Sequence, residues 1–238
     1  RFGAENGDTR RPLFLEKDPD KHHRFVWNYR HMRPFLAKEG WQHWCTCIIH
    51  GFFAYTKCSS FGWTFEIALI ARRSRFNAGT RYRKRGLNAE GQVANEVETE
   101  QLVCDDSTRH LSRGHVTSFV QMRGSVPLFW SQQATPINPK PPVEYLRCDP
   151  TLSATRRHFA DLLERYGTPL LFVNLMKTKK AESHELQLTK QFEIAIERIN
   201  YELPRDVRIS YRSYDMKGHS KSPLRNEEEL GLLAKSVV

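Results

Sequence analysis

The sequence predicts a protein of the mixed α/β class, on two patterns that divide the chain. In the first half, apolar and polar residues alternate with the period of two that is typical of half-buried strands. In the second half, apolar residues recur at helical spacing in two segments, each followed by a short strand-like run. Helix, strand, helix and strand in this order indicate an α/β layer with parallel strands.

The first elements follow from aromatic and aliphatic spacing. Residues 1–23 are polar and lack periodicity, so they predict a loop in which His23 faces solvent. Apolar side chains between Phe25 and Leu36 recur at mixed helical spacing and predict a short helix that stops near Gly40. The apolar run from Cys47 to Tyr55 then predicts a buried strand.

A hairpin with charged walls is predicted next. Phe65, Ile67 and Leu69 alternate with Glu66 and Ala68, as in a strand, and a turn follows at residues 88–91. Basic residues come before the turn and acidic residues come around and after it: Arg72, Arg73, Arg75, Arg81, Arg83, Lys84 and Arg85, then Glu90, Glu96, Glu98 and Glu100.

Two interpretations of this charge order remain open. The opposite charges can pair across the strands on a solvated face, each exposed pair contributing about 0–1 kcal/mol. Alternatively, arginine side chains can form a phosphate site in which carboxylates hold the arginines in place. Glu98 and Glu100 serve in both interpretations, as ion-pair partners or as groups that orient an arginine.

The remaining elements alternate between strands and helices. His115 to Arg123 alternates as a strand, Gly124 to Pro127 breaks it, and the Pro-rich run from Pro136 to Pro142 predicts an extended connector. Asp149 as N-cap, Pro150 at the first helical position and Gly167 after the last predict a helix. Further expected elements are a strand at 170–176, a helix at 183–203, a strand at 207–212 and the start of a helix at 227–238.

Composition limits the class of protein. With 238 residues, 39% of them hydrophobic, the chain can bury a sizeable core. Its net charge of +10 predicts attraction to a polyanion such as anionic lipid, a phosphorylated substrate or nucleic acid. We find neither a secretory signal nor an apolar run of about 18 residues that could span a bilayer. The first residue is Arg1, so we expect a truncated N-terminus.

The cysteines do not form a recognisable framework. Their number, 5, is odd, and their spacing is irregular, so we expect reduced thiols in the cytosol. A zinc site could be assembled from Cys45, Cys47, His50 and Cys58, but this spacing differs from that of zinc fingers. No metal and no cofactor are predicted.

Several motifs in order resemble the Sac-domain family of phosphoinositide phosphatases. R-S-R-x-x-A-G-T-R-Y-x-x-R-G begins at Arg73, and V-A-N-x-V-E-T-E-Q follows from Val93 to Gln101. F-x-W-N at Phe25 and I-H-G-F at Ile49 are similar to earlier segments of the family, and residues 121–132 match Q-x-R-G-S-x-P-x-x-W-x-Q. One motif alone is a weak signal, whereas the ordered set is specific.

The resemblance implies a fold and a mechanism. Residues 1–48 would be a polar segment and the end of the Sac N-terminal subdomain, and residues 49–238 the first part of a cysteine-phosphatase-like α/β catalytic domain. In such a phosphatase a cysteine attacks phosphorus and an arginine of a C-x5-R loop clamps the oxygens. No cysteine here has an arginine six positions later; Cys104 and Arg109 come nearest, one residue short and separated by acidic residues.

Catalytic residues are therefore not expected in this chain. In the family the C-x5-R loop follows a helix in which this sequence ends, so we expect Val238 to be a truncation point and the chain alone to be inactive. The resemblance assigns a substrate-binding or supporting role to a set of basic and polar residues: Arg75, Arg81, Lys84, Arg85, Asn95, Glu98, Gln101 and Arg123. For Trp130, core packing is favoured over a role in the site.

The implied function is removal of a phosphomonoester from a phosphoinositide headgroup at an anionic membrane surface. The protein would be cytoplasmic and peripheral to an intracellular membrane, and no nucleic-acid partner is expected. A non-catalytic phosphoinositide-binding or scaffold protein remains an alternative, because the nucleophile is absent from this sequence. A basic nucleic-acid-binding module is a further alternative, which the acids after the basic run disfavour.

Overall fold

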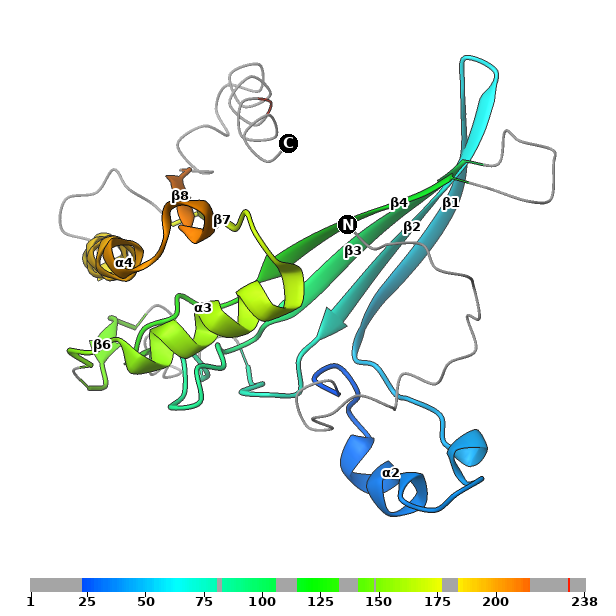
Figure 1. The fold of residues 1–238 in the computed structure, drawn as a ribbon, viewed down its shortest axis with the longest axis horizontal. Coiled ribbons are helices and arrows are strands. Elements are labelled where there is room, and N and C mark those ends of the chain that lie inside the picture. The colour runs from blue at the N-terminus through cyan, green and yellow to red at the C-terminus, as the bar shows by residue number, and fades with distance from the viewer. Residues whose placement is uncertain are drawn as a thin grey trace. The chain divides into compact units, whose positions relative to one another are not determined.

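The fold is described by a computed structural model that covers residues 23–80, 83–105, 115–132, 141–147, 149–176, 184–214 and 231. Helices and β-sheets are mixed, so the predicted α/β class is confirmed (Figure 1). The chain divides into two compact units: residues 1–76 with 97–123 form unit 1, and residues 77–96 with 124–238 form unit 2. The subdomain boundary after residue 48 stays a prediction.

Unit 1 is built on a four-stranded antiparallel sheet whose order along the sheet is β1-β2-β3-β4. The strands are β1 (Gly51–Ser60), β2 (Trp63–Arg73), β3 (Val97–Asp105) and β4 (His115–Arg123). β2 pairs antiparallel with β3 and places Arg72 opposite Glu98, as predicted for charged walls. The predicted turn is wrong as a hairpin turn, because residues 74–96 separate the two strands and residues 88–91 lie inside a bridge between Leu87 and Val93. The bounds of β4 are those that the sequence alternation predicts.

The prediction of a buried strand at Cys47 to Tyr55 is wrong with respect to burial. The segment does enter β1, but Phe52, Phe53 and Tyr55 are each more than half exposed. β1 lies at the edge of its sheet, and no strand residue with a described exposure in β1–β4 is buried. Apolar composition favours a strand, whereas burial depends on what packs against the sheet.

The segment before the sheet contains α2 (Tyr29–Leu36) and a short 3-10 helix (Gln42–Trp44), so the predicted helix is confirmed. His23 is not solvent-facing as predicted, because only 4% of it is exposed. Its ring stacks on Tyr29 with centroids 4.1 Å apart, and its carbonyl accepts a hydrogen bond from Arg75. Both partners lie later in the chain, outside any local pattern.

Unit 2 contains the predicted α/β layer. α3 (Ser153–Tyr166), β7 (Leu171–Asn174), α4 (His184–Glu202) and β8 (Ser210–Ser213) follow one another, and β7 and β8 are parallel as expected. The predicted apolar stripe of α4 is buried. Phe172 of β7 packs against Phe192 of α4 with ring centroids 4.7 Å apart, and Phe159 of α3 joins the same aromatic cluster. A short pair, β5 (Trp130–Ser131) and β6 (Glu144–Tyr145), completes the described strands.

The predicted start of α3 is wrong, whereas its end is confirmed. The helix begins at Ser153 after Leu152, which has a φ of 53°, so Pro150 lies in the preceding turn and Asp149 is not the N-cap. The Asp149 carboxylate still accepts a hydrogen bond from the Ala154 amide at 3.3 Å. Asp149 therefore satisfies an N–H of the first helical turn although it lies three residues before the N-cap, Leu152. Gly167 follows the last turn as expected.

Several predictions lie outside the described residues. These are most of the Pro-rich connector, Arg81, Cys148 and, apart from Gly231, the expected helix at 227–238. Among the helices that the structure describes, none is both long and apolar enough to cross a membrane.

Candidate functional site

Two segments of matched sequence, far apart along the chain, meet in unit 2. The described residues of 77–96 and residues 124–132, which we call the paired loops, are joined by hydrogen bonds. The Gly86 amide donates to Ser125 Oγ at 3.0 Å, and the Ser125 amide donates to the Ala94 carbonyl at 3.1 Å. The Leu87 amide donates to the Leu128 carbonyl at 3.0 Å. The paired loops are therefore one hydrogen-bonded structure within unit 2.

Gly86 makes this close approach possible. Its φ is +67°, and a Cβ at this position would lie 2.5 Å from the Leu128 carbonyl oxygen and 2.7 Å from that of Trp130. Such distances are shorter than van der Waals contact, and positive φ also disfavours other residues. Gly86 therefore permits a backbone geometry that a Cβ would forbid.

Arg85 is held between the paired loops. Its Nε donates to Gln132 Oε1 at 3.0 Å, and its guanidinium lies 5.4 Å from the ring centroid of Trp130. Trp130 is 5% exposed and donates its indole N–H to the Val126 carbonyl, so the prediction of core packing is confirmed. The neighbouring Lys84 is exposed. Two adjacent cations, one of them positioned by an amide and an indole, give this part of unit 2 a local positive charge.

Asn95 fixes the segment that carries these cations. Its backbone has a φ of 56°, a conformation that asparagine tolerates better than most residues. The side-chain oxygen accepts from the Gly79 amide at 3.3 Å, and the side-chain nitrogen donates to the Lys84 carbonyl at 3.2 Å. The predicted residues Lys84, Arg85 and Asn95 are thus brought together.

The other described candidates belong to unit 1, where the charges form a ladder across the sheet. Arg72 donates from Nη1 to Glu98 at 2.8 Å and from Nη2 to Glu100 at 2.6 Å. Burial opposes ionisation of both Arg72 and Glu100, but their mutual contacts prevail, so the pKa of Arg72 is raised and that of Glu100 is lowered. For Arg72 the cross-strand ion-pair interpretation is correct. Gln101 in β3 and Arg123 at the end of β4 are exposed.

Arg75 has contacts that fix it within unit 1. Its Nε donates to the His23 carbonyl at 3.1 Å, and its guanidinium lies 4.3 Å from the ring centroid of Phe76 and 5.6 Å from that of Tyr29. These contacts join the residues just after β2 to His23 and to Tyr29, the first residue of α2. They are the contacts of a side chain that holds two segments together.

A buried ionic cluster in unit 2 is not predicted from the sequence. Glu96 is 2% exposed and accepts a hydrogen bond from Arg165 Nη2 at 2.8 Å, and the same nitrogen donates to Asp161 at 2.8 Å. Burial disfavours the charge of Arg165, but Glu96, Tyr166 and Asp161 raise its pKa overall. Nearby His158 is buried, with Nδ1 3.1 Å from the Gly91 carbonyl oxygen, and burial lowers its pKa to about 4. Glu96 lies inside a matched motif, whereas nothing local marks Arg165 as its partner.

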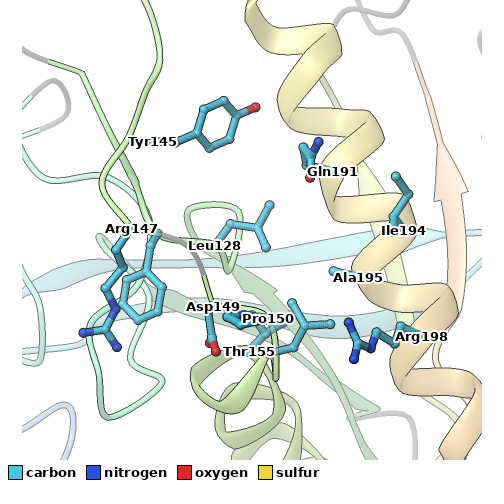
Figure 2. Close-up of a pocket in the computed structure, with 12 residues that line it drawn as sticks. Leu128, Tyr145, Arg147, Asp149, Pro150, Thr155, Gln191, Ile194, Ala195 and Arg198 are labelled. Atoms are coloured by element: carbon cyan, nitrogen blue, oxygen red, sulfur yellow. The ribbon is translucent and has the colours of Figure 1, made fainter.

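An open groove of about 500 Å³ lies between α3, α4 and residues 145–147 and 149–152 of unit 2 (Figure 2). Leu128, Leu152 and Ala195 give it an apolar lining, with Arg147 on one side and Arg198 on the other. Arg147 stacks over Phe129 at 4.0 Å from the ring centroid. The groove is not predicted from the sequence, because its lining comes from segments without a shared periodicity.

Comparison with known proteins places the chain in a family. The family described as SacI homology domain matches residues 5–221. The chain is 43% identical over 216 residues to the phosphoinositide phosphatase SAC3 of Arabidopsis thaliana, covering 89% of this chain and 25% of the relative. It is 40% identical over 222 residues to a polyphosphoinositide phosphatase of Schizosaccharomyces pombe, covering 90% of this chain and 27% of the relative.

The family match over residues 5–221 defines a Sac-type protein. The chain belongs to the Sac-domain family. A further relative, 41% identical over 202 residues and covering 85% of this chain and 22% of the relative, is the phosphatidylinositol-3-phosphatase SAC1 of Arabidopsis thaliana. The chain spans about a quarter of the length of these relatives.

Proposed function

We propose that this chain is the supporting part of a Sac-type phosphoinositide phosphatase, a hydrolase that removes a phosphomonoester from an inositol headgroup. The substrate is a phosphoinositide at the cytosolic face of an intracellular membrane, which the protein contacts peripherally. The names of the relatives, which are phosphoinositide phosphatases, support this reaction class.

The paired loops are the observation that carries the proposal. Two segments that the family resemblance selects, residues 77–96 and 124–132, form one hydrogen-bonded unit that presents Lys84 and Arg85. Arginine and lysine bind phosphate through charge-assisted hydrogen bonds, and an arginine that is already oriented loses less entropy on binding. The proposed role of the paired loops is to hold the headgroup phosphates, with Asn95 as a positioning residue.

The nucleophile in this proposal comes from residues outside this chain. No cysteine of the sequence has the C-x5-R spacing. Cys104 lies in β3, where its backbone pairs with Glu66 on one side and Val116 on the other. In the part of the chain that the structure describes, this thiol lies on an inner strand and not at a helix N-terminus, where backbone N–H groups can bind a phosphate dianion.

Phosphate release from a short-chain phosphoinositide tests this proposal. We expect none from the 238-residue chain and measurable release from a longer protein that contains it and supplies a C-x5-R loop. Turnover by the chain alone that Cys104→Ser abolishes would contradict the proposal. Binding to RNA that is stronger than binding to anionic liposomes at matched salt, and indifferent to phosphoinositide content, would favour a nucleic-acid module.

A further inference from the structure

The turn between β1 and β2 presents two exposed aromatic side chains. Ser60 pairs with Trp63, so Phe61 and Gly62 form a two-residue turn. Phe61 is 99% exposed and Trp63 is 61% exposed. Figure 1 shows this turn, in cyan, extending past the ends of β3 and β4. We call residues 58–65 the hairpin tip.

The backbone of the hairpin tip is unfavourable for the residue that it carries. Phe61 has a φ of 50° and Gly62 a φ of 81°, and a two-residue turn with two positive φ values belongs to the type I′ class. This class favours Asn-Gly, because a bulky side chain in the left-handed region clashes with its own backbone. Since the ring of Phe61 is almost fully exposed, packing within the chain does not offset this strain. A strained residue at an exposed position points to a role in binding.

The hairpin tip is also free of charge. Residues 58–65 contain no acidic or basic side chain. The first charge below the turn is Asp105 of β3, whose backbone pairs with Phe65 three residues (about 10 Å) from the turn, and the next are Lys57 and Glu66, which face each other at 3.6 Å. Four residues at about 3.3 Å each place the turn roughly 13 Å above this ion pair. The tip can therefore enter an apolar phase to the depth of about 5–10 Å typical of interfacial segments without burying a charge.

We propose that the hairpin tip inserts into the membrane interface, with Phe61 among the acyl chains and Trp63 at the level of the headgroups. Tryptophan is favoured at this level because its ring is apolar and its indole N–H is polar. The net charge of +10 adds attraction to an anionic leaflet. This inference rests on the proposed function, in which the substrate headgroup lies at a membrane surface.

Phe61→Asn separates insertion from a structural role. Asparagine suits the turn, so the variant should unfold at the same or a higher urea concentration than the unmodified chain. We expect its partitioning to phosphatidylcholine–phosphatidylserine vesicles to be about tenfold weaker, since a phenyl ring no longer enters the bilayer. Tyr201→Ser, which removes an aromatic side chain that is 87% exposed on α4, is the control and should bind as the unmodified chain does. The vesicles contain no phosphoinositide, so failure here is distinct from failure of headgroup binding.

Fluorescence quenching by brominated acyl chains gives a second, independent readout. Phosphatidylcholine brominated in its acyl chains should quench the tryptophan fluorescence of the unmodified chain more than that of Trp63→Phe. This comparison tests insertion even if Phe61→Asn does not fold. Unchanged vesicle binding by Phe61→Asn together with quenching that does not depend on Trp63 would overturn insertion. So would a dimer of the unmodified chain, seen by light scattering, that Phe61→Asn converts to a monomer, because the tip would then contact a second copy.

Discussion

His158 makes the stability of unit 2 depend on pH. It is 7% exposed on α3, and burial lowers its pKa from 6.5 to about 4, although Glu96 and Asp161 oppose this shift. At this site the folded chain therefore binds a proton less readily than the unfolded chain. The contribution of His158 to stability is fully present above pH 6.5 and is lost as the pH falls toward 4. At 1.36 kcal/mol per pH unit, the loss is about 2 kcal/mol between pH 7.5 and 5 and about 3 kcal/mol below pH 4.

Urea unfolding at pH 7.5 and at pH 5 measures this loss. The pKa values of Glu100 and Asp149 are lowered from 4.5 and 3.8, so their contributions are lost mainly below this interval. His158→Gln, whose side-chain amide can still donate to the Gly91 carbonyl, should reduce the pH-dependent loss by about 2 kcal/mol. His31→Gln, which changes an exposed histidine, is the control. An equal pH dependence in His158→Gln and the unmodified chain would refute the reasoning.

Three substitutions test other parts of the structure by urea unfolding. Glu96→Ala leaves Arg165 without its buried partner and should destabilise by about 3 kcal/mol; a loss below about 1 kcal/mol would show that the pair is not a structural anchor. Gly86→Ala should cost about 2–4 kcal/mol, and more than Gly40→Ala, which shares a positive φ but has open space around it. Equal costs would contradict the close approach of the paired loops. Arg72→Ala should cost about 1–2 kcal/mol and reduce the salt dependence of stability, and an unchanged salt dependence would argue against the charge ladder.

Elements whose signal is local could be predicted from the sequence. The stripe from Leu188 to Ile199 lies at helical spacing and is buried along α4. The strict alternation from His115 to Arg123 gives β4 its bounds, because each residue of a strand faces opposite to the next. The parallel pairing of β7 and β8 follows from an intervening helix.

Elements that depend on distant partners could not be predicted. His23 is buried and contacts Tyr29 and Arg75, and the residue pattern around position 23 does not indicate these contacts. Asp149 and Pro150 are residue types that favour a helix start, yet the helix begins only after Leu152. The left-handed backbone of Leu152 cannot be expected from its side chain. The same limit applies to Glu96 and Arg165, which are 69 positions apart.

For the candidate site, the motifs selected the segments but not all of their contacts. Matched strings indicated both paired loops and the residues Lys84, Arg85 and Asn95. They did not indicate that Gln132 holds Arg85, or that Arg72 donates hydrogen bonds to Glu98 and Glu100. A motif records which residues matter, whereas the fold decides which of them are within hydrogen-bond distance.

Headgroup binding by the paired loops is the most direct test of the central claim. Isothermal titration of the 238-residue chain with dibutanoyl phosphatidylinositol 3-phosphate should show binding that Arg85→Gln weakens about tenfold, since a charge-assisted hydrogen bond is lost. Arg156→Gln is the matched control, because it removes the same charge from a surface pair with Glu202 in the same unit. Equal affinities in the two variants would show that net charge, and not the paired loops, attracts the phosphate.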